Sequence, residues 1–230
     1  MDVKLISYTP DPERLIASAA RLCYSKKCPD DLFENLSDEQ IALLLDIIMK
    51  NKHYSALEHA VFTFSISGIS RACTHQLVRH RMASYNQQSQ RYVKFFDGEL
   101  HHVLPESIKN DPEAEALVVS HLQATDKLYS DLLALNIPAE DARYILPNSS
   151  QSNIVVTMNA RELNHFFSLR CCNRAQWEIR ELAWAMLKLV QEVAPRVFVK
   201  SGPGCLQGQC LEHEMACGQP YHLSDHNVSE

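Results

Sequence analysis

The segment Ala60-Val-Phe-Thr-Phe-Ser-Ile-Ser67 alternates apolar and polar side chains. Its two phenylalanines and its isoleucine fall on one face, so this period of two predicts a half-buried strand, which Gly68 is expected to end. Residues 3–8 and 153–158 carry short apolar runs bounded by turn-forming residues, and they predict two more strands. The chain is therefore expected to contain a small sheet.

Helical spacing of apolar residues covers much of the remaining chain, most clearly in residues 175–193. Ser37 and Gln40 form a capping-box pattern, and Asn159 with Glu162 forms a similar helix start. Helices are expected at residues 11–22, from 37 onward, and at 69–79, 112–135, 139–146, 160–170 and 175–193. The predicted class is α+β, with helices packed on a small, mostly antiparallel sheet.

The composition changes near residue 200. Residues 1–200 contain every expected strand and helix, and they form one predicted domain. Residues 201–230 are rich in glycine and cysteine and show no apolar period. They are expected to form an irregular extension rather than a second domain.

Charge and hydropathy exclude several classes of protein. The 230 residues are 46% hydrophobic and carry a net charge of −6, which gives no general reason to bind nucleic acid or an acidic membrane. No targeting segment is visible, and no apolar run approaches the roughly 20 residues of a membrane-spanning helix. A soluble, cytoplasmic protein is expected. Its eight cysteines, including the adjacent Cys171 and Cys172, are expected to be reduced thiols.

The chemistry concentrates in the segment Arg79-His-Arg-Met-Ala-Ser-Tyr-Asn-Gln-Gln-Ser-Gln-Arg-Tyr92. No acidic residue lies between Glu58 and Asp97, and this local excess of arginine in an acidic chain indicates an anionic partner. Arginine suits planar, bidentate recognition of phosphate, and the interleaved amides and hydroxyls suit a sugar or a base. A solvated basic loop is the alternative, although uncharged amides are an unusual choice for a face that only needs solubility.

This segment resembles the signature of the flavin-dependent thymidylate synthases, in which Arg-His-Arg is followed by seven residues and a serine. Here the signature runs from Arg79-His80-Arg81 to Ser89, and the resemblance continues through Arg91. Three further segments resemble the same family: His53-x-Ser55-x-x-Glu58-His59, Ala142-Arg143-x-x-Leu146-Pro147, and Asn159-Ala-Arg161-x-Leu163 through Leu169-Arg170 to Ala175-Gln-Trp-Glu-Ile179. Together they cover roughly residues 1–200.

The resemblance implies an enzyme that methylates dUMP to dTMP. FAD would relay hydride from NADPH, and methylene-tetrahydrofolate would supply the carbon unit. The resemblance also implies a cytoplasmic homotetramer with active sites at the subunit interfaces. It implies no cysteine nucleophile, and Ser89 is assigned to binding because no base adjacent in the sequence would activate it.

Two sets of site residues follow from the resemblance. The flavin would be lined by His53, Ser55, Glu58, Arg79, His80, Arg81, Asn86, Gln87, Asn159, Arg161 and His165. The nucleotide would be held by Gln76, Arg79, Gln87, Gln88, Ser89, Gln90, Arg91, Arg143 and Arg170. Arg170 is the expected catalytic residue, because a guanidinium that hardly ever deprotonates can stabilise negative charge at N3/O2 of the uracil.

Two of these residues have a plainer interpretation. His165 shares a helical face with Arg161, but it could also be a packed core histidine, and family members often have asparagine at this position. Arg143 could form a salt bridge with Glu140 or Asp141 on its own short helix.

Two further positions leave alternatives. Gln87 stands where some family members have glutamate, so a charge near the nucleotide is lost while a donor and an acceptor remain. Tyr92 could equally belong to the core.

The tail offers possible zinc ligands, at Cys205, Cys210, Cys217, His213, His222 and His226. The spacing Cys-x4-Cys-x6-Cys is not the tight Cys-x2-Cys of ribbon sites. Reduced thiols without a bound metal are therefore expected, with zinc as the alternative. Cys171 and Cys172 are expected to be packing residues beside Arg170.

Two other functions are weighed against the synthase. A nucleotide- or RNA-binding regulatory protein could use the same basic segment, but RNA readers usually offer more aromatic platforms than the four aromatic side chains here, Tyr85, Tyr92, Phe95 and Phe96. A family member could also keep flavin and lose catalysis. The intact set of Arg79, Ser89, Arg143 and Arg170 argues against that second alternative.

Overall fold

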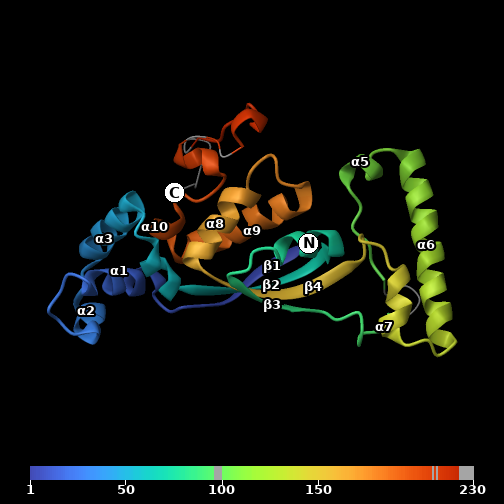
Figure 1. The fold of residues 1–230 in the computed structure, drawn as a ribbon, viewed down its shortest axis with the longest axis horizontal. Coiled ribbons are helices and arrows are strands. Elements are labelled where there is room, and N and C mark those ends of the chain that lie inside the picture. The colour runs from blue at the N-terminus through green and yellow to red at the C-terminus, as the bar shows by residue number, and fades with distance from the viewer. Residues whose placement is uncertain (96–99, 209, 211, 223–230) are drawn as a thin grey trace. The chain divides into compact units, whose positions relative to one another are not determined.

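A computed structural model gives the fold of residues 1–95, 100–208, 210 and 212–222 (Figure 1). Phe96, Asp97 and His226 lie outside the described residues. Four strands form one antiparallel sheet in the order β1-β2-β4-β3. Their bounds are β1 Asp2–Tyr8, β2 Val61–Ser70, β3 Ala83–Gln87 and β4 Gln151–Asn159. With the helices given below, this sheet confirms the predicted α+β class.

Strand β2 contains the alternating segment and buries the predicted face. Phe62, Phe64 and Ile66 are all 0% exposed. The prediction that Gly68 ends the strand was wrong, because β2 continues to Ser70. Gly68 has a φ of 72°, which side chains rarely tolerate, so glycine allows the strand to pass through a local distortion without stopping.

Strand β3 was not expected, because its sequence contains hardly any apolar residues. The strand alternates half-buried and exposed positions, and it lies at the edge of the sheet beside β4. Polar side chains are well suited to an edge strand, where one side of the backbone has no partner strand. A search for alternating apolar residues therefore misses it.

The chain divides into two compact units. The smaller unit contains residues 1–2, 66–79 and 86–155, and the larger unit contains residues 3–65, 80–85 and the chain from Val156 onward. The helices of the larger unit are α1 Pro12–Leu22, α2 Pro29–Asn35, α3 Asp38–Asn51, η1 Tyr54–His59, α8 Ala160–Arg170, α9 Trp177–Val193, α10 Pro195–Phe198, η3 Gly204–Gln207 and η4 His213–Met215. Those of the smaller unit are α4 Arg71–Leu77, α5 Glu106–Lys109, α6 Pro112–Ala134, α7 Ala139–Ala142 and η2 Arg143–Ile145. The division at residue 200 stays a prediction.

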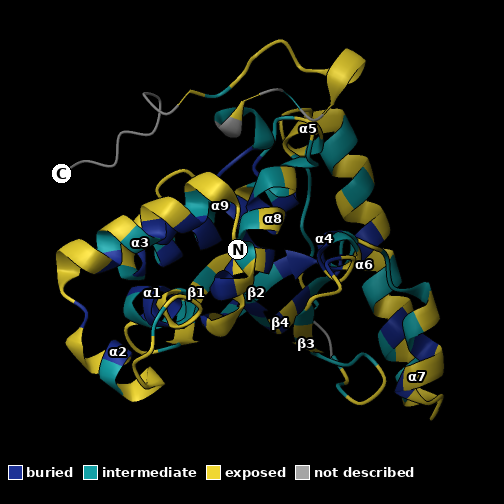
Figure 2. Ribbon diagram, turned by 60° about the vertical axis from the view of Figure 1, so that its left-hand side comes forward, coloured by how far each residue is buried: buried dark blue, intermediate teal, exposed yellow. Residues whose placement is uncertain are grey.

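The core of the larger unit is a cluster of aromatic rings from three elements. Phe62 of β2 and Phe167 of α8 both contact Phe198 of α10, with ring centroids 5.5 and 6.1 Å apart. Phe166 adds a contact to Phe167 at 5.7 Å, and all four rings are 0% exposed. Helix α9 lies beside α8 (Figure 1), and its buried positions form the stripe that its helical period predicts (Figure 2).

Most of the predicted helices are confirmed, with ends shifted by a few residues. Helix α3 begins after Ser37, whose Oγ accepts the N–H of Gln40 at 3.3 Å, and Gln40 Oε1 accepts the N–H of Ser37 at 3.0 Å. Helices α2 and α10 were missed because helices of seven and four residues are too short for an apolar period. The helix expected at residues 139–146 is instead α7 followed by the 3-10 turn η2.

Helix α6 of the smaller unit exposes much of its length (Figure 2). Leu122 and Tyr129 are buried, whereas three of the apolar positions that predicted the helix, Leu117, Leu128 and Leu135, are 69%, 48% and 73% exposed. Hence the described part of the chain leaves several apolar side chains of α6 and its C-terminal end exposed. Among the helices that the structure describes, none combines the length and apolarity needed to cross a membrane.

Candidate active site along helix α8

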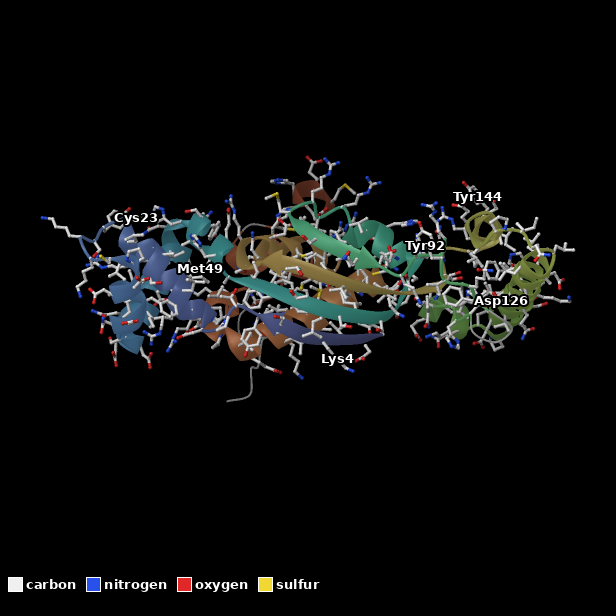
Figure 3. The ribbon with its side chains drawn as sticks, turned by 90° about the horizontal axis from the view of Figure 1, so that it is seen from below. Lys4, Cys23, Met49, Tyr92, Asp126 and Tyr144 are labelled. Atoms are coloured by element: carbon white, nitrogen blue, oxygen red, sulfur yellow. The ribbon has the colours of Figure 1, made fainter. Side chains whose placement is uncertain are left out.

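The larger unit contains a cleft of about 600 Å³ along helix α8. Its walls come from α3, which contributes Met49 (Figure 3), from η1, from the segment before β3, and from α8 itself. The cleft is lined by Met49, Tyr54, Leu57, Glu58, Met82, Asn159, Arg161, Glu162, Asn164, His165 and Ser168. Four of the predicted flavin residues therefore meet here: Glu58, Asn159, Arg161 and His165.

Helix α8 fixes the polar side chains of this cleft. Asn159 is the N-cap, and its Oδ1 accepts the N–H of Glu162 at 2.9 Å. Arg161 and His165 follow one helical turn apart, on the same face. Arg161 Nη1 donates to Glu58 Oε1 at 2.5 Å, and both side chains are about half exposed. A cationic side chain thus stands where an anionic ligand can reach it, near a helix N-terminus that favours negative charge.

His80 forms the buried centre of the site and is 5% exposed. Its Nδ1 lies 3.3 Å from Glu162 Oε1, and its Nε2 accepts a hydrogen bond from Arg170 Nε at 3.1 Å. The ring is therefore the neutral tautomer with its proton on Nδ1. Burial, together with the positive charge of Arg170 and the neighbouring His165, lowers the pKa of His80 to about 4.

Residues around His80 fix its position further. The backbone oxygen of His80 accepts the Tyr85 hydroxyl at 2.8 Å, and the His80 ring packs edge-on against Phe166 at 4.9 Å. Burial, followed by the nearby Glu162, raises the pKa of Tyr85, so this hydroxyl remains a donor. Burial also raises the pKa of Glu162. Arg170 is therefore the permanently charged cation of the buried network formed with His80, Tyr85 and Glu162.

The stability of the protein should fall as the pH drops from 6.5 toward 4, with His80 as a cause. In this window the unfolded chain takes a proton at His80 that the folded chain, with its pKa near 4, does not take. Glu162 acts in the opposite sense, because its raised pKa adds stability at low pH that is lost as the pH rises. The variant His80→Gln should therefore lose less stability between pH 6.5 and pH 4 than the wild type. Urea unfolding at a series of pH values measures this difference.

The matched control is His121→Gln, at an exposed position on α6. This variant should keep the wild-type pH dependence. If the free energy of unfolding depends equally on pH in His80→Gln and in the wild type, His80 is not held neutral in the folded protein.

The side chains that could hold a metal here are His80, Glu162 and His165, whose ligand atoms lie within 4.8 Å of one another. However, the Nδ1 of His80 is engaged by Glu162 and its Nε2 by Arg170. The guanidinium of Arg170 also places a positive charge beside the group, which opposes the binding of a cation. The donor set is thus better suited to an anionic or polar organic ligand.

Two predicted flavin residues lie in a different cavity of the larger unit. His53 and Ser55 line a space of about 370 Å³ between α1, α3 and η1, together with Tyr24 and Ile48. In the chain they are separated from Glu58 by one turn of η1. The predicted flavin set is therefore not gathered in one cavity of the single chain.

The nucleotide set lies in the smaller unit, except for Arg170. Gln87 of β3 donates from Nε2 to Thr74 Oγ1 at 3.1 Å and to Ser152 Oγ at 2.9 Å. The Gln87 amide thus satisfies two neighbouring hydroxyls. Gln88 pairs through its backbone N–H with Asn153 O at 2.9 Å and accepts from Asn153 Nδ2 at 3.2 Å.

Arginines gather elsewhere in the same unit. Arg91 is paired with the Glu140 carboxylate at 2.8 Å, and Arg143 donates from Nε to the backbone oxygen of Glu140 at 3.1 Å. Among the described residues Arg143 forms no ion pair with Glu140 or Asp141, so that plainer interpretation is wrong; its hydrogen bond goes to the backbone of Glu140. Burial, followed by the charge of Arg143, lowers the pKa of Arg71, so the two guanidinium charges lie within electrostatic range of each other.

Arg71 is a candidate anion-binding residue that was not assigned from the sequence. The only signal was its place in the acid-free, arginine-rich window. The other predicted residues are exposed or half-buried. Arg79 and Asn86 of the smaller unit and Arg81 of the larger unit are exposed. Gln76, Ser89 and Gln90 of the smaller unit are half-buried. Ser89 Oγ accepts the N–H of Arg91 at 3.2 Å.

Two of the plainer interpretations are wrong. His165 is exposed at the cleft, so it is not a packed core histidine. Tyr92 is 76% exposed (Figure 3), so it does not belong to the core, and the Arg91 guanidinium lies 5.3 Å above its ring. In contrast, Cys171 is 0% exposed, as its packing role requires.

Comparison with known proteins identifies the family of this chain. Residues 4–196 match the model of the family described as thymidylate synthase complementing protein. The flavin-dependent thymidylate synthase of Geobacter sulfurreducens is 53% identical to this chain, and the match covers 95% of this chain and 94% of the relative. The enzyme of the same name from Clostridium tetani is 43% identical, and the match covers 94% of this chain and 93% of the relative. A Helicobacter pylori enzyme of the same name, solved with FAD and dUMP, superposes with a TM-score of 0.68 at 28% identity, covering 86% of this chain and 98% of its own. This chain belongs to the family of flavin-dependent thymidylate synthases.

Proposed function

We propose that this protein methylates dUMP to dTMP, with methylene-tetrahydrofolate as the carbon donor, NADPH as the reductant and FAD as the bound cofactor. The observation that carries the proposal is the arrangement along α8. Asn159, Arg161 and His165 line the cleft, and Arg170 ends the same helix in contact with His80. One rigid helix thereby carries both flavin-binding candidates and the arginine assigned to the uracil.

The cleft fits a flavin in size and in chemistry. Its volume of about 600 Å³ lies within the range of about 300–1,000 Å³ typical of cofactor sites. Leu57, Met82 and Met49 offer apolar contacts for a ring, and Arg161 with the N-terminus of α8 suits a phosphate group. Glu58, Asn159, Arg161 and His165 would hold FAD, which when bound supplies the hydride-transfer chemistry.

The smaller unit would bind the phosphate of dUMP. Arg91, Arg143 and the backbone at Ser89 and Gln90 remain the proposed contacts, and Arg71 joins them because its guanidinium is close to Arg143. Arg91 already pairs with Glu140, so a phosphate would compete for a guanidinium held in place. Arg170 would hold the uracil and stabilise negative charge on the ring.

The homotetramer with interfacial sites is part of the proposal. It is supported by the exposed apolar residues of α6, which a neighbouring copy could cover, and by the separation of His53 and Ser55 from the cleft. A cytoplasmic location stays a prediction from the sequence.

The direct test is the visible absorption spectrum of the purified protein under anaerobic conditions. Flavin bands should bleach when NADPH is added, and they should recover when dUMP and methylene-tetrahydrofolate are supplied together, with dTMP formed. A colourless protein that takes up no added FAD would contradict the proposal.

The variant Arg161→Gln should weaken FAD binding about 10- to 100-fold, because a charge-assisted hydrogen bond contributes about 1.5–3 kcal/mol. Fluorescence titration of FAD into the apoprotein measures this change. The matched control is Lys188→Gln, which removes an exposed cation from the neighbouring helix α9 and should leave the dissociation constant unchanged. Equal weakening in both variants would indicate a general effect of net charge instead of a contact.

A further inference from the structure

Four cysteines line one cavity of about 210 Å³ in the larger unit. Three of them, Cys205, Cys210 and Cys217, come from the tail, and the fourth, Cys172, comes from the segment that follows α8. All four are free thiols, and three are only partly exposed. The spacing in the sequence did not suggest this set, because Cys172 precedes the tail cysteines by more than thirty residues.

The backbone around these thiols is arranged to donate hydrogen bonds to sulfur. The N–H of Arg174 points to Cys172 Sγ at 3.4 Å, and the N–H of Gln219 points to Cys217 Sγ at 3.4 Å, so the same turn from residue i+2 back to residue i occurs twice. A third N–H, that of Tyr221, lies 3.4 Å from the sulfur of Cys205.

These hydrogen bonds indicate what the sulfur atoms are suited to. A neutral thiol is a weak acceptor, so three N–H groups gain little from it. A metal-bound thiolate is negatively charged and accepts strongly, and outer hydrogen bonds of this kind orient metal ligands and tune the metal. Three of the four sulfur atoms, those of Cys172, Cys205 and Cys217, therefore have a backbone donor of the kind that a metal-bound thiolate accepts.

The part of the tail that the structure describes contains little regular structure. Its regular structure consists of the short turns η3 and η4, and Met215 is 61% exposed. One anchor of the tail is Tyr221, whose ring lies 5.6 Å from that of Trp184 and whose hydroxyl donates to Asn173 Oδ1 at 2.8 Å. Segments with so little buried apolar surface are commonly held by a metal.

We propose that Cys172, Cys205, Cys210 and Cys217 form a structural zinc site with four thiolate ligands. Four sulfur ligands in a closed tetrahedral arrangement are typical of Zn²⁺, and soft thiolates select it over Mg²⁺ or Ca²⁺. Each thiol releases its proton to solvent as its sulfur binds the ion, so binding is coupled to the folding of the tail.

Zinc must draw the sulfur atoms closer together than the structure has them. Among the described residues, the group whose ligand atoms come within 4.8 Å of one another is His80, Glu162 and His165, and no cysteine belongs to it. The proposal therefore requires the tail to move near Cys217, where Gly218 has a φ of 72° and open space at its Cβ position. The ion would then tie the tail to Cys172, two residues beyond Arg170.

The proposal does not depend on the enzymatic reaction, and neither does its test. Untagged protein, expressed with zinc and purified in a reducing buffer without chelator, should contain about one zinc ion per chain by elemental mass spectrometry. Each of the single substitutions Cys172→Ser, Cys205→Ser, Cys210→Ser and Cys217→Ser should lower zinc to background. The matched control, Cys28→Ser, changes an exposed cysteine outside the cavity and should retain the metal.

Two further measurements keep the test decisive if a serine variant fails to fold. Replacement of zinc by Co²⁺ in the wild type should produce the intense visible bands of a tetrahedral thiolate site. Titration of the wild type with a mercurial reagent should release the zinc as about four thiols react. Zinc-free protein that shows no cobalt bands, zinc retained in both Cys205→Ser and Cys217→Ser, or a disulfide between two of the four cysteines in anaerobically isolated protein would overturn the site.

Discussion

Replacement of Arg170 by alanine is expected to lower kcat for dTMP formation by about 10²–10³-fold, the loss typical of removing one preorganised electrostatic donor. The flavin should stay bound, because the residues proposed to hold it, Asn159, Arg161 and His165, lie earlier on α8. Steady-state kinetics combined with the flavin-to-protein ratio of the purified variant measures both effects.

The reason lies in the contact between Arg170 and His80. Arg170 Nε donates to a ring nitrogen of a histidine that stays neutral, so this hydrogen bond orients the guanidinium without placing a negative charge against it. A guanidinium held in this way can stabilise negative charge on the uracil without moving during the reaction. Arg170→Lys keeps the charge but loses the planar group, and we expect an intermediate rate.

The variant Arg170→Ala can also be followed through the pKa of His80, which reports the electrostatic contact separately from the folding of the protein. The charge of Arg170 is one of the causes of the low pKa of His80, so Arg170→Ala should raise that pKa toward 6.5, as followed by NMR of the imidazole. Lys188→Ala, on the exposed face of α9, serves as the control and should change neither the rate nor the pKa. A wild-type rate in Arg170→Ala would remove Arg170 from the proposed chemistry.

The elements that could be predicted from the sequence are those whose pattern is local. The alternation in residues 60–67 and the helical period of residues 175–193 arise because one face of each element is buried, and both elements are confirmed. Strand β3 and helix α10 could not be predicted in this way. The first is a polar edge strand, and the second holds a core phenylalanine, Phe198, in a helix of four residues.

The residues of the candidate site could also be predicted only in part from the sequence, but for a different reason. The arginine-rich segment could be found from composition, because its charge differs from that of the whole chain. The contact between His80 and Arg170 joins residues that are 90 positions apart, and the sulfur cavity joins Cys172 to the tail. Such pairs depend on how the chain folds back, which no local pattern encodes. The assignment of each residue to flavin or nucleotide came from family resemblance and stays a prediction.

Phe198→Ala is expected to destabilise the protein by about 3–5 kcal/mol, the usual effect of truncating a buried phenylalanine. The Phe198 side chain is 0% exposed and lies between Phe62 of β2 and Phe167 of α8, at ring distances of 5.5 and 6.1 Å. Its removal leaves a cavity in the layer that supports α8, and the rings around it cannot collapse onto one another without moving that helix. Chemical unfolding of the apoprotein measures the loss directly.

The adjacent residue provides the matched control for this substitution. Val199 is 53% exposed, so Val199→Ala should change the free energy of unfolding by no more than about 0.5 kcal/mol. A loss in Phe198→Ala similar to that of the control would show that the aromatic cluster does not hold α10 against α8. If the large loss is found, FAD should also dissociate at a lower temperature from Phe198→Ala, because the helix that carries Arg161 and Arg170 rests on this cluster through Phe167.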